Sequence, residues 1–502
     1  MSGDPASYDL FVIGGGINGC GVARDAAGRG YQAALAEQGD LAEGTSSRST
    51  KLVHGGLRYL EHFAFGMVRE ALRERETLMS IAPHLVRPLR FVLPVLPGGR
   101  PAWLLRFGLF LYDHLGGREK LPGTEALDLR DVPEGAPLRP SLRKGFAFSD
   151  CRVDDSRLVV LNARDAADRG ATIFTRTRVL RAWAEQGAWR VVLRDATGGD
   201  REVAARLIVN AAGPWAGAAL GAVLGVQAAP RLRLVRGSHI VTRKLFDHDS
   251  AYLFQAGDGR VVFAIPYCDD FTLIGTTDAD FSGAPDEAAI TPDEIAYLCA
   301  VASGFFARPV GAGDVVWSFS GVRPLRDDGA GDAAQASRDY VLDERRVEGA
   351  PLLSILGGKL TAFRHVAEQV ADRAALSLGA RGKRWTAAAR LPGGDLSRGD
   401  LAAFARDLVA HYPFLTAREA ARLAGAYGTV AGTILGAAKK REDLGRDFGL
   451  GLSEAEVEHL VTREWARTAE DILWRRSKLG LWAPPEMAGA LDEWLATHSE
   501  GA

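Results

Sequence analysis

The stretch Tyr8-Asp-Leu-Phe-Val-Ile-Gly-Gly-Gly-Ile-Asn-Gly19 joins an apolar strand directly to a glycine-rich turn. A helix-compatible run from Cys20 to Gly30 follows, and then a second strand, Gln32-Ala-Ala-Leu-Ala-Glu37. Three glycines stand where a GxGxxG motif requires them: Gly14, Gly16 and Gly19. A strand, this turn, a helix and a second strand that ends in an acid form a dinucleotide-binding βαβ unit. We therefore expect an α/β fold with a Rossmann-like domain.

Each residue of this unit has a specific part in binding a dinucleotide. Gly14 permits the tight turn, Gly16 lets backbone amides approach a pyrophosphate, and Gly19 allows close packing of helix and sheet. The start of the helix, at Ile17 and Asn18, offers partial positive charge to the phosphates. The carboxylate of Glu37 is expected to accept hydrogen bonds from ribose hydroxyls.

Two later segments resemble returns to the same sheet. Arg206–Trp215 is a strand that ends in small residues, and Leu352–Thr361 is an apolar strand followed by Gly357 and Gly358. Both place backbone at the carboxyl end of a strand, where open α/β sheets bind ligands. A cofactor touched by segments so far apart requires a discontinuous domain, which is more typical of flavoproteins than of nicotinamide dehydrogenases.

The remaining sequence predicts two further parts. Leu232–Thr277 has short apolar runs separated by turn signals and predicts an antiparallel sheet that forms a substrate floor. Leu391–Asp395 resembles a linker, and Leu396–Thr497 is helical. The expected domains are a dinucleotide-binding domain (1–80, 145–230 and 320–380), a substrate-binding domain (81–144 and 231–319) and an all-α C-terminal domain (391–502).

Composition narrows the class of protein. The 502 residues are 47% apolar and 25% charged, which is ordinary for a globular enzyme. Lys and Arg number 61 against 63 Asp and Glu, so the net charge is −2 and bulk charge does not favour nucleic acid. The four cysteines form no CxxC pair, so neither a metal site nor a disulfide framework is predicted, and a cytoplasmic location fits.

Several blocks resemble those of the FAD-dependent glycerol-3-phosphate dehydrogenases, within the glycine/D-amino-acid-oxidase-like flavoproteins. The resemblance extends from the first strand to the last helical region. The blocks are Gly14–Gly19, Gly44–Glu61, Arg236–Ile240, Ile274–Asp278, Ser320–Leu325, Ser337–Tyr340, Gly357–Thr361 and Glu464–Trp474. The resemblance implies oxidation of sn-glycerol 3-phosphate to dihydroxyacetone phosphate by hydride transfer to FAD, with the electrons passed to a quinone.

The resemblance also implies which residues contact FAD, beyond the glycine motif and Glu37. They lie in four separate segments of the chain. These residues are Thr45, Ser46, Ser47, Leu52, Val179, Ala212, Gly213, Gly358, Lys359, Leu360 and Thr361. Val179 is expected at the end of a strand that faces the adenine, and the segment from Gly358 is expected near the pyrimidine edge of the flavin.

A glycerol phosphate carries close to two negative charges, so its site needs several fixed cations. The resemblance implies that the substrate is surrounded by Arg58, Tyr59, His239, Arg323, Arg338, Lys359 and Thr361. Among these, His239, Arg323 and Lys359 are expected to be catalytic. His239 is the first candidate for the base that removes the hydroxyl proton, and His54 is the second. Neighbouring cations can also stabilise the alkoxide without a dedicated base.

The electrons must then leave the flavin. The family implies a quinone acceptor and a peripheral contact with the inner face of the cytoplasmic membrane, and a homodimer is compatible with the sequence. Two segments are candidates for the membrane contact: Trp103–Tyr112, an apolar run that contains Arg106, and Trp474–Trp482, which is basic and aromatic. A buried or interfacial helix suits the first segment, and such segments are more often core and solvated face, respectively, than membrane anchors.

Other functions remain as alternatives. A glycerol-3-phosphate oxidase would pass the electrons to oxygen, and no residue distinguishes it from a dehydrogenase. An amine or amino-acid oxidase needs one Arg and a neutral pocket, and a non-catalytic flavin-binding regulator needs no cluster of cations. A nicotinamide dehydrogenase is disfavoured by the late return at Gly357 and Gly358.

Overall fold

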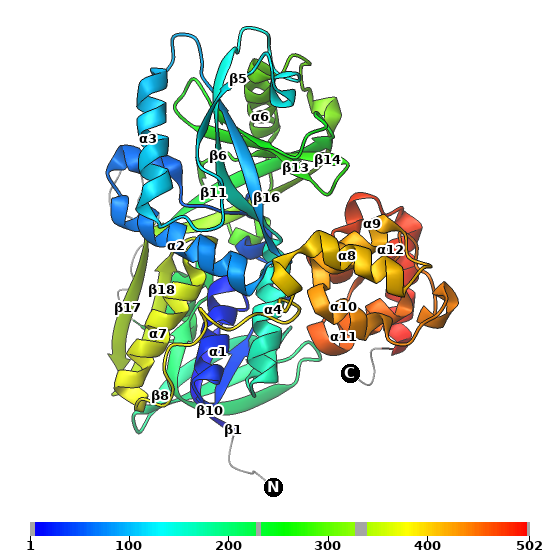
Figure 1. The fold of residues 1–502 in the computed structure, drawn as a ribbon. Coiled ribbons are helices and arrows are strands. Elements are labelled where there is room, and N and C mark those ends of the chain that lie inside the picture. Colours follow the sequence, from blue (N-terminus) through cyan, green and yellow to red (C-terminus); the bar gives the residue numbers. More distant parts are fainter. Residues whose placement is uncertain (1–5, 227–231, 327–338, 499–502) are drawn as a thin grey trace.

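The computed structural model describes residues 6–226, 232–326 and 339–498, which form three parts (Figure 1). A sheet with flanking helices contains the N-terminus, a second sheet lies above it in the view, and a group of helices lies to one side. This arrangement agrees with the expected α/β fold, antiparallel substrate sheet and all-α C-terminal part.

The first sheet contains eight strands within the described residues. They are β1 (Ala6–Ile13), β2 (Ala33–Ala36), β7 (Thr172–Phe174), β8 (Arg178–Glu185), β9 (Ala188–Arg194), β10 (Asp200–Asn210), β17 (Tyr340–Val347) and β18 (Ala350–Gly357). The order is β17-β18-β10-β1-β2-β7, and β8 and β9 extend from β10. Strands β18, β10, β1, β2 and β7 are parallel, so their carboxyl ends meet at one edge. Both predicted returns to this sheet, β10 and β18, are confirmed.

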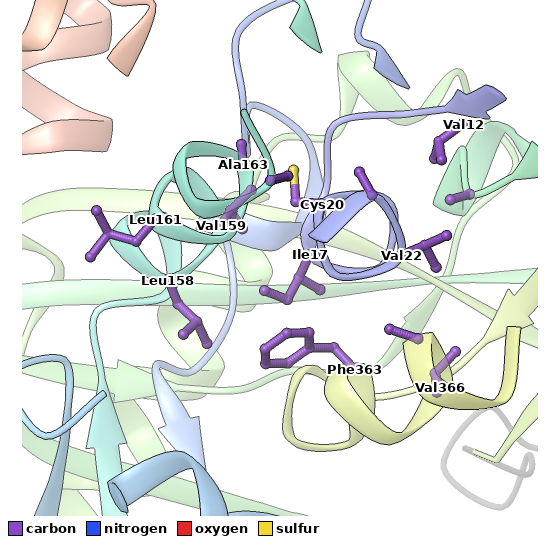
Figure 2. Packing of buried hydrophobic residues seen from close by; sticks show 14 of the residues in the cluster. Val12, Ile17, Cys20, Val22, Leu158, Val159, Leu161, Ala163, Phe363 and Val366 are labelled. Atoms are coloured by element: carbon purple, nitrogen blue, oxygen red, sulfur yellow. The ribbon is translucent and has the colours of Figure 1, made fainter. Parts of the chain in front are cut away.

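Three helices pack together against this sheet: α1 (Ile17–Gly28), α4 (Asp155–Asp168) and α7 (Phe363–Leu378). Figure 2 shows α1 between the other two, with Cys20 near Val159 and Ile17 near Phe363. A Cβ on Gly21 would lie 2.8 Å from the ring of Phe363, so this glycine permits the close approach of α1 and α7. Small residues therefore fix the position of the helix that begins at the glycine motif.

The second sheet holds the predicted substrate floor. Its strands are β3 (Leu52–Val53), β4 (Val86–Pro94), β5 (Glu125–Asp128), β6 (Lys144–Val153), β11 (Leu232–Arg243), β12 (Ala251–Gln255), β13 (Val261–Tyr267), β14 (Phe271–Gly275), β15 (Ala279–Asp280) and β16 (Val315–Arg326). Pairing is antiparallel except between β4 and β12. Helices α2 (Phe65–Ile81), α3 (Ala102–Leu115) and α6 (Pro292–Phe305) accompany this sheet.

The structure moves two of the expected domain boundaries. Residues 145–153 belong to β6 and residues 320–326 belong to β16, and both strands pair within the second sheet. The limits at 145 and 320 therefore cut through strands that continue in the substrate-binding part. The pattern of polar and apolar residues does not change at residue 145 or 320, because each strand pairs along its full length. The sequence therefore gave no signal that these limits were misplaced.

The C-terminal part is helical, as predicted. It contains α8 (Leu401–His411), α9 (Ala417–Tyr427), α10 (Ala431–Leu435), α11 (Glu454–Glu464), the π-helix η12 (Asp471–Arg476) and α12 (Pro485–His498). The Ser453 hydroxyl accepts a hydrogen bond from the Glu456 N–H at the start of α11. The expected linker Leu391–Asp395 is packed instead: Leu391 is buried, and a Cβ on Gly393 would overlap the Tyr427 carbonyl.

Candidate functional site

The glycine motif forms a tight cradle after β1. Gly14 has φ +111°, and a Cβ there would lie 2.7 Å from the Ala211 carbonyl oxygen, so only glycine suits the position. A Cβ on Gly19 would overlap the Gly14 carbonyl, and one on Gly16 would lie 3.1 Å from Ser46 Oγ. Helix α1 begins immediately after Gly16, with Ile17 and Asn18 in its first turn. The backbone here leaves room for a phosphate group and presents helix-start amides to it.

Glu37 lies directly after β2 and connects two loops. Its carboxylate accepts hydrogen bonds from Gly15 N–H (2.6 Å) and Gly39 N–H (2.9 Å). Burial raises the pKa of this carboxyl, while the two backbone hydrogen bonds oppose that shift. The acid at the end of the second strand therefore lies beside the glycine motif, as the βαβ pattern predicts.

The segment Thr45–Ser47 closes the same region from the side. Ser46 Oγ accepts a hydrogen bond from Ile17 N–H (3.0 Å), and Thr45 Oγ1 donates to the Val322 carbonyl (2.6 Å). The Ser47 carbonyl accepts a hydrogen bond from Lys51 Nζ (2.9 Å). These contacts tie the segment to α1 and to β16, the strand that carries Arg323.

The two later loops reach the same edge of the sheet. Ala212 and Gly213 follow β10, and Gly213 has φ +55°. Gly358 follows β18 with φ +98°, and a Cβ on it would lie 4.0 Å from Asn18 Nδ2. The chain then turns through Lys359, Leu360 and Thr361 into α7. Segments that are more than 300 residues apart in sequence thus meet around one cradle.

Two of the predicted cofactor residues are placed differently from the others. Val179 is buried, but it is the second residue of β8 rather than the end of a strand, so that part of the expectation is wrong. Leu52 lies on β3 and lines the substrate cavity described below. The glycine cradle, Glu37 and the converging loops nevertheless fit a dinucleotide such as FAD.

A cavity of about 350 Å³ lies between the second sheet and the segment η2 (Leu57–His62). Its wall is apolar on the sheet side, where Phe91, Phe148 and Phe263 contribute their rings. Arg58 and Tyr59 enter it from η2. Arg58 is half-buried and makes no ion pair with any residue in the described part of the chain. The cavity therefore contains a cation that an anionic substrate can neutralise.

Arg323 and Lys359 do not line the cavity themselves, but each contacts residues that do. Arg323 forms an ion pair with Asp278 and donates a hydrogen bond to Thr276 Oγ1 (3.0 Å), and both partners line the cavity. Lys359 Nζ lies 3.4 Å from the centre of the Tyr59 ring, a cation–π contact. Three predicted cations thus lie in or beside the lining of one cavity with Tyr59, and Arg323 is paired with the carboxylate of Asp278.

Two other predicted substrate residues have different outcomes. Thr361 is buried, and its hydroxyl bonds the His54 backbone, accepting from N–H (3.3 Å) and donating to C=O (3.4 Å). Arg338 lies outside the described residues. His54, the second candidate for the base, lines the cavity and meets the Phe263 ring edge-on.

His239 lies on the face of the sheet that borders the cavity. In the strand register His239 pairs with Gly275, Gly275 with Phe263, and Phe263 with Leu253, and directly paired residues share a face. Phe263 and Leu253 line the cavity. A Cβ on Gly275 would overlap the imidazole, so the ring of His239 occupies the space that the glycine leaves.

The electrostatics of His239 differ from those of a free imidazole. Its Nε2 is 3.0 Å from Thr50 Oγ1, its ring stacks on Phe319, and its side chain is completely buried. Burial lowers its pKa well below 6.5, and the charges of Arg323 and Lys51 lower it further. His239 is therefore neutral at neutral pH, which allows it to accept a proton but leaves it a weak base.

The sequence reasoning missed several residues of this site. Asp278 and Thr276, which hold Arg323, lie in the block Ile274–Asp278 that carried the resemblance without being assigned a role. Thr50, which contacts His239, lies in the block Gly44–Glu61 and was likewise not assigned a role. The contact of Lys51 with Asp155 (2.9 Å) gave no signal at all, because the two lie 104 residues apart in sequence.

Comparisons with known proteins agree with this site. Residues 9–364 match the family model "FAD dependent oxidoreductase", and residues 384–500 match "C-terminal domain of alpha-glycerophosphate oxidase". The chain is 51% identical over 493 residues to D-erythritol 1-phosphate dehydrogenase of Brucella abortus, covering 98% of each. It is 48% identical to glycerol-3-phosphate dehydrogenase of Pseudomonas aeruginosa, covering 98% of this chain and 95% of that one. It is 44% identical to aerobic glycerol-3-phosphate dehydrogenase of Escherichia coli, covering 98% of each.

A solved structure resembles the whole chain. The glycerol-3-phosphate dehydrogenase of Bacillus halodurans, complexed with FAD, has a TM-score of 0.78 and 28% identity, covering 99% of this chain and 91% of that one. Glycine oxidase of Geobacillus kaustophilus shares the fold over 74% of this chain, with a TM-score of 0.56 and 19% identity. The chain is an FAD-dependent oxidoreductase and belongs to the family of the FAD-dependent glycerol-3-phosphate dehydrogenases.

Proposed function

We propose that this enzyme oxidises sn-glycerol 3-phosphate to dihydroxyacetone phosphate. The observation that carries the proposal is the cavity that Arg58 enters without a carboxylate partner among the described residues, with Lys359 and Arg323 in contact with its lining residues Tyr59 and Asp278. A phosphate dianion supplies a negative partner for Arg58. The names of the relatives from Pseudomonas aeruginosa and Escherichia coli support the same substrate.

The residues of the chain bind and orient the substrate. Arg58 and Lys359 hold the anionic end, and each charge-assisted hydrogen bond contributes about 1.5–3 kcal/mol. The rings of Phe91, Phe148 and Phe263 exclude water from the sheet side and strengthen these interactions. The reaction needs a two-electron acceptor at the oxidised carbon, and FAD supplies this when it is bound in the glycine cradle.

The hydroxyl proton of the substrate must also be removed. His239 is neutral and lies on the cavity face, so it can accept the proton at a ring nitrogen. Because its pKa is low, the nearby charges of Arg323 and Lys359 are needed to stabilise the alkoxide that forms. We assign these three residues the catalytic roles on this basis.

The test is the flavin absorbance of the purified holoenzyme before and after anaerobic addition of sn-glycerol 3-phosphate. The expected result is a rapid loss of the visible absorbance band of the oxidised flavin. An amino acid or amine that bleaches it instead would overturn the proposal. Reoxidation by oxygen faster than by a quinone analogue in stopped flow would identify an oxidase rather than a quinone-linked dehydrogenase.

A second substrate, D-erythritol 1-phosphate, is favoured by one specific observation. The relative from Brucella abortus that is named for this substrate shares 51% of its residues with this chain over 98% of both. The two phosphates differ by one CHOH unit, and one such unit changes selectivity by only about 1–3 kcal/mol in a pocket that does not bind its hydroxyl. Comparing kcat/KM for the two phosphates on the same enzyme decides between them.

We further propose that α3 places the enzyme on a membrane surface, where a quinone is available. Trp103, Phe107 and Phe110 share one face of α3, and 70%, 54% and 55% of their surfaces are exposed. Phe63, beside η2, is 78% exposed. No helix of the described residues is long and apolar enough to cross a bilayer. Because these aromatic side chains are exposed, the helix formed by Trp103–Tyr112 is not completely buried, and an interfacial helix fits it better.

The same surface lies next to the cavity. Glu61, His62 and Met67 line the cavity and flank Phe63, and Glu61 and His62 are exposed. A quinone in the bilayer would therefore approach the cavity from this side. Co-sedimentation with anionic vesicles tests the contact: Phe107→Glu should lose binding while bleaching by substrate is retained. Equal sedimentation of the wild type and Phe107→Glu would overturn it.

A further inference from the structure

A buried cluster of charges joins the helical part to the dinucleotide-binding part. Asp40 accepts hydrogen bonds from Arg475 Nε (2.6 Å) and from both terminal nitrogens of Arg476 (2.8 Å each). Asp40 and Arg476 are almost completely buried, and Arg475 is 6% exposed. Arg476 also donates to the Glu464 carbonyl (2.7 Å). The segment Trp474–Trp482 is therefore not a solvated basic face, since its arginines are internal.

Asp40 belongs to the loop Glu37–Gly44, which we call the ribose loop because it begins with Glu37. On its other side this loop contacts the glycine motif: Glu37 accepts from Gly15 N–H, and Ala42 N–H donates to the Gly15 carbonyl (3.2 Å). One short loop thus touches the dinucleotide cradle with one side and the arginines of η12 with the other. Asp40 and Glu37 lie three residues apart in this loop, so we expect a displacement of Asp40 to be transmitted to Glu37.

A second contact holds the same loop to η12. Arg176 Nη2 donates to Asp471 Oδ2 (2.6 Å), and the backbone N–H of Arg176 donates to the Gly39 carbonyl (2.9 Å). Asp471 is fully buried and also binds Arg475. The ribose loop is thereby held at two adjacent residues, Gly39 and Asp40, by side chains that belong to or contact one π-helix.

A third contact follows two residues beyond η12. Lys478 Nζ bonds the Ser156 hydroxyl and lies 3.5 Å from Asp154, at the start of α4. The neighbouring Asp155 holds Lys51, whose Nζ also bonds the Ser47 carbonyl. The C-terminal part therefore also supports the segment Thr45–Ser47, which closes the cradle from the other side.

Buried ion pairs contribute little net stability, because desolvation offsets much of their attraction. Removing one partner, however, is costly, so the cluster permits only one position of the loop. We propose that the C-terminal helical part clamps FAD: Arg475 and Arg476 hold Asp40, and through it Glu37, in the position that retains the adenosine end of the cofactor. Arg475 and Arg476 are positioning residues, since neither lines the substrate cavity.

The experiment measures FAD release from the holoenzyme by the rise of flavin fluorescence after dilution. Arg476→Met should release FAD about tenfold faster or more, within the range of about 5- to 150-fold that is typical of coupled sites. Arg475→Lys keeps the charge and should restore most of the retention relative to Arg475→Met. At saturating FAD, the KM for glycerol 3-phosphate should be unchanged in all three.

Arg422→Met is the matched control. Arg422, whose side chain is 15% exposed, forms an ion pair with the buried Glu456 (2.6 Å) inside the helical part, away from the ribose loop. It should destabilise the helices without accelerating FAD release. Equal release by Arg422→Met and Arg476→Met would overturn the clamp, as would wild-type release by a folded Arg476→Met.

A reciprocal measurement remains decisive if Arg476→Met does not fold. Linkage requires that a cofactor held by the clamp also holds the clamp closed. In the wild type, FAD should therefore slow proteolysis of the helical part relative to enzyme that has been stripped of FAD. Identical cleavage of the helical part with and without FAD would overturn the proposal, while bleaching of the holoenzyme by substrate would leave the proposed function intact.

Discussion

The ion pair between Arg323 and Asp278 makes a quantitative prediction about two similar substitutions. Arg58→Met removes one charge-assisted bond to the substrate, which costs about 1.5–3 kcal/mol, or roughly 10- to 150-fold in kcat/KM. Arg323→Met removes such a bond and also takes a cation from Asp278, whose side chain is only 7% exposed. The carboxylate that is left without its partner repels the substrate phosphate, so Arg323→Met should lose more kcat/KM than Arg58→Met, and it should also destabilise the fold by about 3–5 kcal/mol.

The double variant Arg323→Met/Asp278→Asn separates the two contributions. Neutralising Asp278 removes a carboxylate that would repel the substrate phosphate, so the double variant should recover to about the level of Arg58→Met. The assay is steady-state kcat/KM for glycerol 3-phosphate with an artificial electron acceptor, on enzymes matched for FAD content. Strict additivity of the two single changes would refute the reasoning, because it would mean that Asp278 and Arg323 act independently.

Three further predictions concern histidines and one glycine. Gly275→Ala should lower kcat severalfold at unchanged FAD content, because a Cβ there displaces the ring of His239; normal turnover would contradict that placement. His239→Ala should lower turnover but leave the shape of the pH profile between pH 6 and 8 unchanged, because the pKa of His239 lies well below that window; loss of an inflection near 6.5 would count against it. Burial lowers the pKa of His84 to about 3, with Arg157 adding to the shift, so the unfolded chain binds a proton below pH 6.5 that the folded chain does not. His84 should therefore lower the free energy of unfolding, measured in urea, by about 2.5 kcal/mol between pH 7 and 4.5. This decrease should be absent in His84→Met, and an equal pH dependence of the wild type and His84→Met would disprove it.

The sequence allowed four strands of the dinucleotide-binding sheet to be anticipated where local chemistry determined them, but not their order. Gly14, Gly16 and Gly19 predict a specific turn because only glycine fits there, and the structure places them against Ala211 and Ser46. The late strand that ends at Gly357 could be assigned to the same sheet for a similar reason. The loop after this strand begins with glycines, which leave the backbone accessible to a ligand. Local stereochemistry thus carried these predictions.

The misjudged segments share a different property. Whether Trp103–Tyr112 faces inward depends on which side of α3 meets the sheet, and whether Arg475 and Arg476 are solvated depends on Asp40, which is 435 residues away from Arg475. Both outcomes are set by contacts between distant segments. Composition favoured a buried or interfacial helix for the aromatic run and a solvated face for the basic run. In the structure one face of the aromatic helix is exposed, and the two arginines of the basic run are buried.

In the substrate site, the cluster of Arg58, Arg323 and Lys359 around one cavity was expected, but its charge balance was not. Asp278 reduces the net positive charge at Arg323, and burial makes His239 a weaker base than a free imidazole. Neither effect is encoded in residue type or spacing, because both depend on which groups the fold brings within a few ångströms. The role of each residue in the site remains a prediction that the variants above test.

The close packing of Leu391–Asp395 restricts how this enzyme can be engineered. Gly393 and Gly428 face each other so tightly that neither position has room for a Cβ, and Leu391 N–H donates to the Ile81 carbonyl. A chimaera that exchanged the C-terminal quarter at this junction would pack the helical part of one parent against the dinucleotide-binding part of another, and their contact residues would not be complementary. Recombination between homologues should therefore succeed only when Ile81, Asp40 and the segment after residue 390 come from the same parent.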